Sequence, residues 1–122
     1  MKSIFGVLLF GLFATAISAQ PVTANTALPD PAKKILLVEA SCGKCKLGLP
    51  GKSCDLAVRI NGKAYYVDGA DIDSYGDAHA KHGFCLAIRK AEVQGEIVNN
   101  RFKATYFKLI PVPASKEIKN TN

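Results

Sequence analysis

The sequence has 122 residues, a formal net charge of +6 and four cysteines, enough chain for one small domain. It carries no phosphate-binding loop, dinucleotide fingerprint or serine nucleophile elbow, which excludes the enzyme classes built on those motifs. The excess of basic residues is compatible with an acidic partner, whereas we expect no nucleic acid, because the N-terminus predicts export from the cytoplasm.

Residues 1–19 have the features of a secretory signal peptide. Lys2 precedes an apolar run of about 14 residues, and small residues follow this run before Gln20. The run is shorter than the roughly 20 residues that span a bilayer, and an uncleaved anchor helix is the alternative interpretation. We expect cleavage after residue 19, a periplasmic or secreted protein, and no transmembrane anchor in its mature form.

Flexible segments are expected on both sides of the ordered domain. Residues 20–32 are rich in Pro, Ala, Thr and Asn and show no periodicity, which is typical of a flexible lead-in. Residues 111–122 combine two prolines with polar residues and predict a flexible tail. Residues 33–110 form a domain so small that its core alone gives marginal stability, so we expect disulfides or a metal ion to reinforce it.

Alternating and β-branched residues predict five strands, at residues 34–40, 55–60, 63–67, 90–98 and 101–110. Asn61 and Gly62 join the second strand to the third. This pair is the strongest short hairpin signal, because a type I′ turn needs two residues that accept positive φ. Such a turn places Val58 opposite Tyr65 and leaves one mostly apolar face.

The second half of the domain predicts a short helix and another hairpin. Asp77 is expected to cap a helix over residues 78–82, which reaches residue 88 in its longest form. A turn at residues 99–100 then places Glu96 opposite Lys103, and this ion pair favours that register.

Five strands with a helix between the third and the fourth match the order of an OB-fold barrel. The sequence therefore predicts a mainly β fold with one short helix, a small five-stranded OB-like barrel. An open β-meander or a sandwich with a helix is the alternative.

The cysteines follow the spacing C-x2-C-x8-C-x30-C, at Cys42, Cys45, Cys54 and Cys85. A close pair of thiolates can chelate zinc or copper, so one transition metal ion is a candidate cofactor. The cysteines can instead form two disulfides, in any of three pairings, as is common in exported small domains. In a third interpretation Cys42 and Cys45 form a thiol–disulfide redox pair, in which Lys44 favours the thiolate.

Two histidines lie close to the fourth cysteine. His82 follows His79 by three positions and Cys85 follows His82 by three, so a continuous helix would project all three from one side. Together with Asp77 they are candidate ligands that extend the metal site beyond the cysteines.

A candidate binding surface combines aromatic and basic residues. Tyr65 and Tyr66 lie on a predicted strand, and OB-type barrels bind ligands through such aromatic side chains. Lys44, Lys46 and Lys52 lie in the adjacent cysteine-rich segment and give this surface its positive charge.

Several motifs occur in one order: Cys42-Gly-Lys-Cys45, Cys54-Asp-Leu-Ala-Val58, Tyr66-Val-Asp-Gly69, Gly76-Asp-Ala-His-Ala80 and Gly83-Phe-Cys-Leu-Ala-Ile-Arg-Lys-Ala91. With these motifs the chain resembles, over about residues 38–109, a family of small exported proteins of Gram-negative bacteria whose function is unknown. The resemblance implies export and does not imply an activity.

The leading hypothesis is a non-enzymatic, exported binding domain whose Cys/His region binds a metal ion or is locked by disulfides. One alternative is a periplasmic thiol–disulfide redox protein that uses Cys42 and Cys45. The other is a disulfide-stapled interaction module with a basic face.

Overall fold

The computed structural model describes residues 23–112, so the predicted signal peptide lies outside the described part of the chain, as does most of the predicted tail. Its elements, in chain order, are β1 (Leu36–Cys42), α1 (Gly43–Lys46), β2 (Leu56–Ile60), β3 (Lys63–Asp68), β4 (Arg89–Val98) and β5 (Arg101–Leu109). All five predicted strands are present, each within two residues of its predicted bounds.

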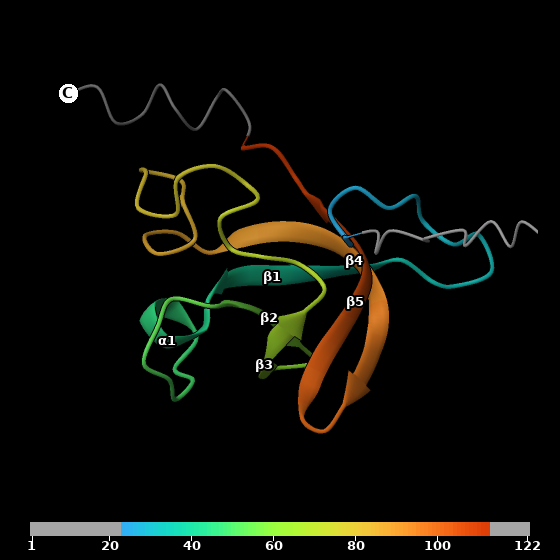
Figure 1. The fold of residues 1–122 in the computed structure, drawn as a ribbon, viewed down its shortest axis with the longest axis horizontal. Coiled ribbons are helices and arrows are strands. Elements are labelled where there is room, and N and C mark those ends of the chain that lie inside the picture. The colour runs from blue at the N-terminus through green and yellow to red at the C-terminus, as the bar shows by residue number, and fades with distance from the viewer. Residues whose placement is uncertain (1–22, 113–122) are drawn as a thin grey trace, which may run out of the picture.

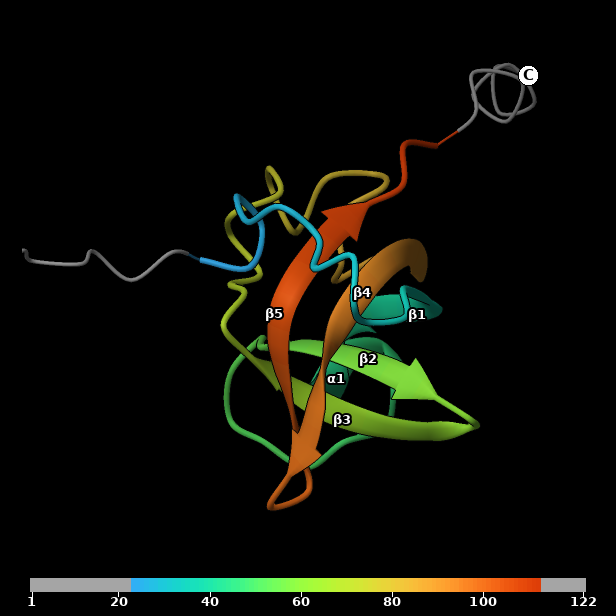
Figure 2. The ribbon, with the colours of Figure 1, turned by 90° about the vertical axis from the view of Figure 1, so that its right-hand side faces the viewer.

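The five strands form a closed barrel in the order β1-β2-β3-β5-β4, with β1 also paired to β4 (Figures 1 and 2). The pairing of β3 with β5 is parallel, and the other four pairings are antiparallel. This is the connectivity of an OB-type barrel. The predicted fold class is therefore confirmed, and the open meander is excluded because the sheet closes on itself.

Both predicted hairpin registers are confirmed. Val58 pairs with Tyr65 across the first hairpin, and Glu96 pairs with Lys103 across the second. Asn61 has a φ of 50°, and the glycine that follows it has a φ of 81°, so both turn residues occupy the left-handed region that a type I′ turn requires.

The core lies inside the barrel and continues under the long segment between β3 and β4. Val58, Val93, Phe102 and Phe107 are at most 1% exposed, and Phe84 from the long segment packs against the same cluster. The ring of Tyr75 makes an edge contact with Phe84 at a centroid distance of 5.7 Å. The β3–β4 segment therefore closes one end of the barrel with its own apolar side chains.

The segment before β1 is bonded to the barrel at two points. Ala24 is buried, its amide donates to Gly69 and its carbonyl accepts from Phe107, each at 2.9 Å. The buried side chain of Gln94 accepts from the amide of Asp30 at 2.7 Å and donates to the carbonyl of the same residue at 2.9 Å. The flexibility expected for residues 20–32 stays a prediction, but from residue 23 this stretch has defined contacts.

The predicted helix over residues 78–82 is wrong, and the longer form to residue 88 is wrong too. Residues 77–88 form successive turns, in which the amide of Ala80 bonds Asp77 and the amide of Gly83 bonds Ala80. A Cβ at Gly83 would collide with the carbonyl oxygens of Asp77 and Ala78, so the chain folds back on itself there. The one helix of the described residues is α1, in the cysteine-rich segment.

No helix within residues 23–112 has both the length and the apolar character needed to cross a membrane.

Candidate metal centre

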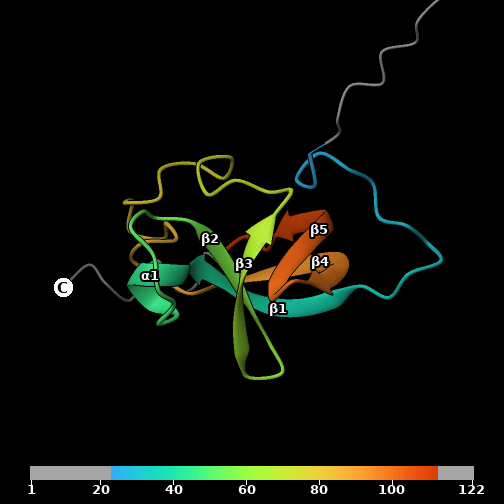
Figure 3. The same ribbon diagram turned by 60° about the horizontal axis from the view of Figure 1, so that its bottom comes forward.

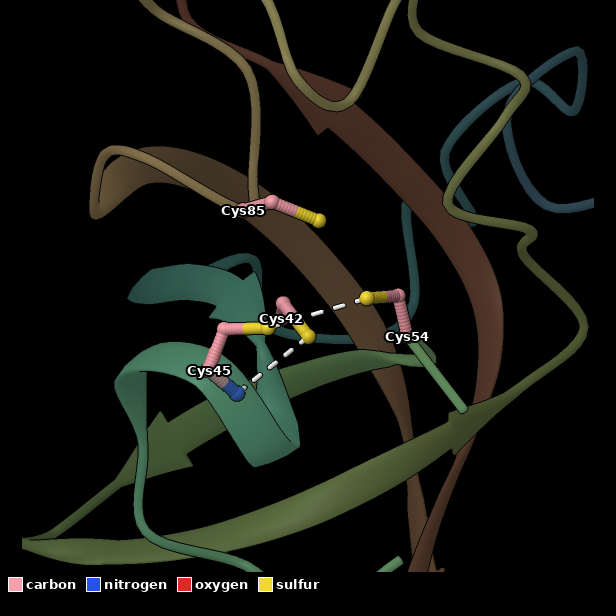
Figure 4. Close-up of side chains that lie close together, drawn as sticks. All are labelled: Cys42, Cys45, Cys54 and Cys85. Atoms are coloured by element: carbon pink, nitrogen blue, oxygen red, sulfur yellow. Dashed lines mark hydrogen bonds between the residues drawn. The ribbon is translucent and has the colours of Figure 1, made fainter. Parts of the chain in front are cut away.

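Four cysteines from different parts of the chain converge at one end of the barrel. Cys42 ends β1, Cys45 lies in α1, Cys54 lies two residues before the start of β2, and Cys85 lies in the segment that leads into β4 (Figure 4). Figures 1 and 3 show α1 and the segment before β4 side by side at this end. The two cysteine-bearing regions, separated by the 30 residues between Cys54 and Cys85, thus meet in the fold.

The sulfur atoms of these cysteines all lie within 4.8 Å of one another. Those of Cys45 and Cys54 are 3.6 Å apart. In a tetrahedral zinc site with Zn–S bonds of about 2.3 Å, the sulfur atoms are about 3.8 Å from one another. A disulfide bond is only about 2.05 Å long, and all four cysteines are free thiols in the structure. The spacing therefore fits ligands around one ion.

The close cysteine pair is shaped by the first turn of α1. Cys42 is the N-cap residue, and its sulfur accepts a hydrogen bond from the amide of Cys45 at 3.4 Å. The amide of Gly43 bonds the carbonyl of Asp55 at 2.9 Å, which fixes the turn to the residue between Cys54 and β2. Hydrogen bonds to a ligand sulfur hold it in place and stabilise its charge.

Tyr66 supports the cysteine-rich segment from β3. Its hydroxyl donates to the carbonyl of Pro50 at 2.7 Å. Its ring lies so close to Gly43 and Gly51 that a Cβ at either position would be 2.5–2.6 Å from a Tyr66 atom. Tyr66 was predicted as part of an open binding surface, but the structure places its ring under the loop that carries three of the cysteines.

The fourth cysteine is brought to the others by hydrogen bonds to the end of β1. The amide of Cys42 donates to the carbonyl of Phe84 at 2.9 Å. The buried hydroxyl of Ser41 contacts the carbonyls of Phe84 and Ala87 at 2.6 and 2.9 Å. These bonds position Cys85 against Cys42. Sequence reasoning missed Ser41, although a serine directly before a cysteine in an apolar strand is a signal of a buried polar contact.

The four thiols differ in their exposure to solvent. Cys42 is fully buried and Cys85 is 7% exposed. Cys45 is exposed and Cys54 is half-buried. The cluster therefore has a buried half, held by the barrel, and an open half, held by the cysteine-rich loop.

Hydrogen bonding lowers the pKa of one thiol in the cluster. Burial opposes ionisation of Cys42, but hydrogen bonds from the amides of Cys45 and Lys44 and from neighbouring thiols lower its pKa. The pKa of Cys45 is raised to about 11, first by its hydrogen bond with the Cys42 sulfur and then by its hydrogen bond with Cys54. The hydrogen bond with Cys85 raises the pKa of Cys54, and burial raises that of Cys85. Four thiolates at this spacing therefore need a cation between them.

The other predicted ligands are not members of this group. His79 and Asp77 are 75% and 73% exposed, with 3.9 Å between the imidazole Nδ1 and the carboxylate. The amide of His79 bonds the same carboxylate, as in an Asx turn. The carbonyl of His82 accepts from Arg89 at 2.8 Å. The cluster of potential ligands in the described residues comprises the cysteines alone.

The remaining residues of the predicted binding surface lie around the cluster or on β3. Lys44, Lys46 and Lys52 are exposed and belong to the same segment as three of the cysteines. Tyr65 is half-buried, and the ammonium of Lys63 lies 5.2 Å from the centre of its ring. The three lysines thus give the segment that carries three of the cysteines an exposed positive charge.

The chain belongs to a family of unknown function, DUF6370, whose sequence profile matches residues 36–110. The matched region runs from the start of β1 to the residue after β5 and contains all four cysteines. Comparison with curated proteins and with solved structures gave no match. The expected relationship to a family of unknown function is confirmed, and the site must be interpreted from its own geometry.

Proposed function

We propose that this protein is an exported domain that binds one zinc ion through Cys42, Cys45, Cys54 and Cys85. The observation that carries the proposal is the convergence of four sulfur atoms within 4.8 Å. Zinc prefers such a tetrahedral set of thiolates. Disulfides need sulfur atoms only in pairs, so they give no reason for all four to meet at one point.

The bound ion would tie the cysteine-rich loop to the barrel and to the segment before β4. It would connect the end of β1, the turn of α1, the start of β2 and the residues before β4. Four thiolates around a divalent ion leave an excess of negative charge, which Lys44, Lys46 and Lys52 offset in part. These lysines are also the natural contacts for the acidic partner that the basic charge predicts.

A redox pair at Cys42 and Cys45 is less consistent with the geometry. A reactive cysteine combines a lowered pKa with exposure to its substrate. Cys42 has the lowered pKa but is fully buried, whereas the exposed Cys45 has its pKa raised to about 11. Neither thiol meets both conditions.

The test is zinc binding by the reduced protein. Native mass spectrometry should show one zinc per chain, and a competing chelator should give the affinity. Cys42→Ser and Cys85→Ser should abolish high-affinity binding, since each removes a ligand from the buried half of the site. His79→Ala and His82→Ala are the matched controls and should bind zinc as tightly as the wild type. Wild-type protein without bound zinc, or loss of binding in the histidine variants, would contradict the proposal.

Export is tested separately, by fractionating cells and measuring the intact mass. We expect the exported fraction to contain a chain that begins at Gln20. A full-length chain confined to the cytoplasm would contradict this part of the proposal.

A further inference from the structure

We propose that Cys45 and Cys54 are an oxidation site, at which a disulfide forms and releases the metal ion while Cys42 and Cys85 stay reduced. This inference rests on the proposed zinc site and adds its regulation.

The first argument is access. Oxidation of a cysteine depends on thiolate character and exposure, because the oxidant must reach the sulfur. Zinc binding makes all four sulfurs thiolates, so their exposure to solvent decides which cysteines the oxidant reaches first. Cys42 is 0% and Cys85 is 7% exposed, whereas Cys45 is exposed and Cys54 is half-buried.

The second argument is distance. The sulfur atoms of Cys45 and Cys54 are 3.6 Å apart, so a bond of about 2.05 Å needs an approach of about 1.5 Å. The chain between them is largely exposed and includes Gly48 at a φ of 71°, Pro50 and Gly51. A loop of this composition can absorb the small shift without changing the barrel.

The third argument is the rigidity of the other two cysteines. Cys42 pairs with Leu56 in the β1–β2 ladder, and its amide bonds Phe84. The amide of Cys85 bonds Ala78 at 2.9 Å. Backbone bonds thus fix the main chain of both buried cysteines, while Cys45 and Cys54 lie at the two ends of the loop.

The chemistry needs a two-electron oxidant, and hydrogen peroxide is the simplest. The Cys45 thiolate attacks one peroxide oxygen, which forms a sulfenic acid and releases hydroxide. The Cys54 thiolate then attacks the sulfenic sulfur, forms the S–S bond and displaces a second hydroxide. Two thiolates have lost two electrons to one peroxide. The ion keeps only Cys42 and Cys85 as protein ligands and dissociates.

The experiment follows the disulfide and the zinc together. Reduced, zinc-loaded protein is treated with one equivalent of peroxide, and released zinc is measured with a chromogenic chelator. Free thiols are then alkylated and the protein is cut with trypsin. Each cysteine falls in its own tryptic peptide: residues 35–44, 45–46, 53–59 and 82–89.

We expect a cross-link between peptides 45–46 and 53–59, alkylated peptides 35–44 and 82–89, and one zinc released for each disulfide formed. Cys54→Ser should give no cross-link and leave a sulfenic acid at Cys45 that a sulfenic-acid probe captures. If that variant does not fold, the cross-linked and alkylated peptides of the wild type still show which cysteines form the disulfide.

A first disulfide that includes Cys42 or Cys85, or a Cys45–Cys54 disulfide that leaves zinc bound, overturns this inference and leaves the zinc site intact. Reduced protein that takes up no zinc overturns the proposed function itself. The two failures are therefore distinguishable.

Discussion

Substituting Gly43 tests whether Tyr66 holds the cysteine-rich loop. In Gly43→Ala the new Cβ would lie 2.5 Å from Cε1 of Tyr66 and 3.1 Å from Cβ of Ala57. The ring cannot retreat without loss, because its hydroxyl bonds Pro50 at 2.7 Å and the guanidinium of Arg101 lies 5.6 Å from its centre. The added methyl group therefore strains the turn that carries Cys42 and Cys45.

Opposing contributions set the change in the free energy of unfolding of Gly43→Ala. Overpacking of this kind costs about 1–3 kcal/mol, and loss of the Tyr66 hydrogen bond adds about 0.5–1.5 kcal/mol. Gly43 has no positive φ, so alanine in the first turn of α1 recovers about 0.5–1 kcal/mol of helix propensity. We expect Gly43→Ala to lower the free energy of unfolding by about 1–3 kcal/mol and to weaken zinc binding.

The decisive control is the same substitution in a Tyr66→Ala background. Without the ring the favourable helix term is opposed only by the 3.1 Å contact with Cβ of Ala57, so Gly43→Ala should there change the free energy of unfolding by less than about 1 kcal/mol. Urea unfolding of the four proteins of this double-mutant cycle measures both effects. An equal effect of Gly43→Ala in the two backgrounds would refute the role assigned to Tyr66.

Three further predictions concern the thiols and their support. Free zinc at 100 times its dissociation constant should stabilise the wild type by about 2.7 kcal/mol. This corresponds to a rise of about 11–22 °C in melting temperature. The melting temperature of Cys85→Ser should not change when zinc is added. Ser41→Ala should cost about 0.5–1.5 kcal/mol, because it removes a buried hydrogen bond to Phe84, whose carbonyl then keeps only the amide of Cys42. Ser53→Ala, which loses an exposed bond to Asp55, should cost less than about 0.5 kcal/mol, and comparable losses in denaturant melts would contradict this. The pKa of Cys45 is raised to about 11, against 9.0 unperturbed, so the folded state favours the protonated thiol. Metal-free reduced protein should therefore lose stability as the pH rises from about 9 to about 11. An equal loss in Cys45→Ser would argue against Cys45 as the cause.

The sequence predicts the strands and hairpins because their signals are local. Asn61 and Gly62 dictate a turn by their tolerance of positive φ, and the register then follows from residue counting. The same holds for the turn before Arg101. The helix is different. Asp77 and the residues after it satisfy helix-start rules, but Gly83 packs against carbonyl oxygens of that same segment, and this contact exists only in the folded chain.

The sequence predicts that the site contains cysteines, but it does not predict which of the candidate ligands come together. The spacing of Cys42, Cys45 and Cys54 indicates a shared site, because all three belong to one loop. That Cys85 joins them depends on the long-range pairing of β1 with β4 and on the bonds from Ser41, which no local pattern specifies. His79 satisfied the same spacing rule as Cys85, yet it lies exposed, because the helix that would have aligned the two residues does not form.

The barrel and the cysteine-rich loop are stabilised by different means. Each strand of the barrel has a neighbour on both sides, so backbone ladders and the apolar core hold it without help from the cysteines. The loop is attached through few contacts, mainly the amide of Gly43, the hydroxyl of Tyr66 and the thiols themselves. A metal ion at the thiols would therefore order the loop more than the barrel. The proposed oxidation of Cys45 and Cys54 would therefore release the ion and loosen the loop while the barrel stays folded.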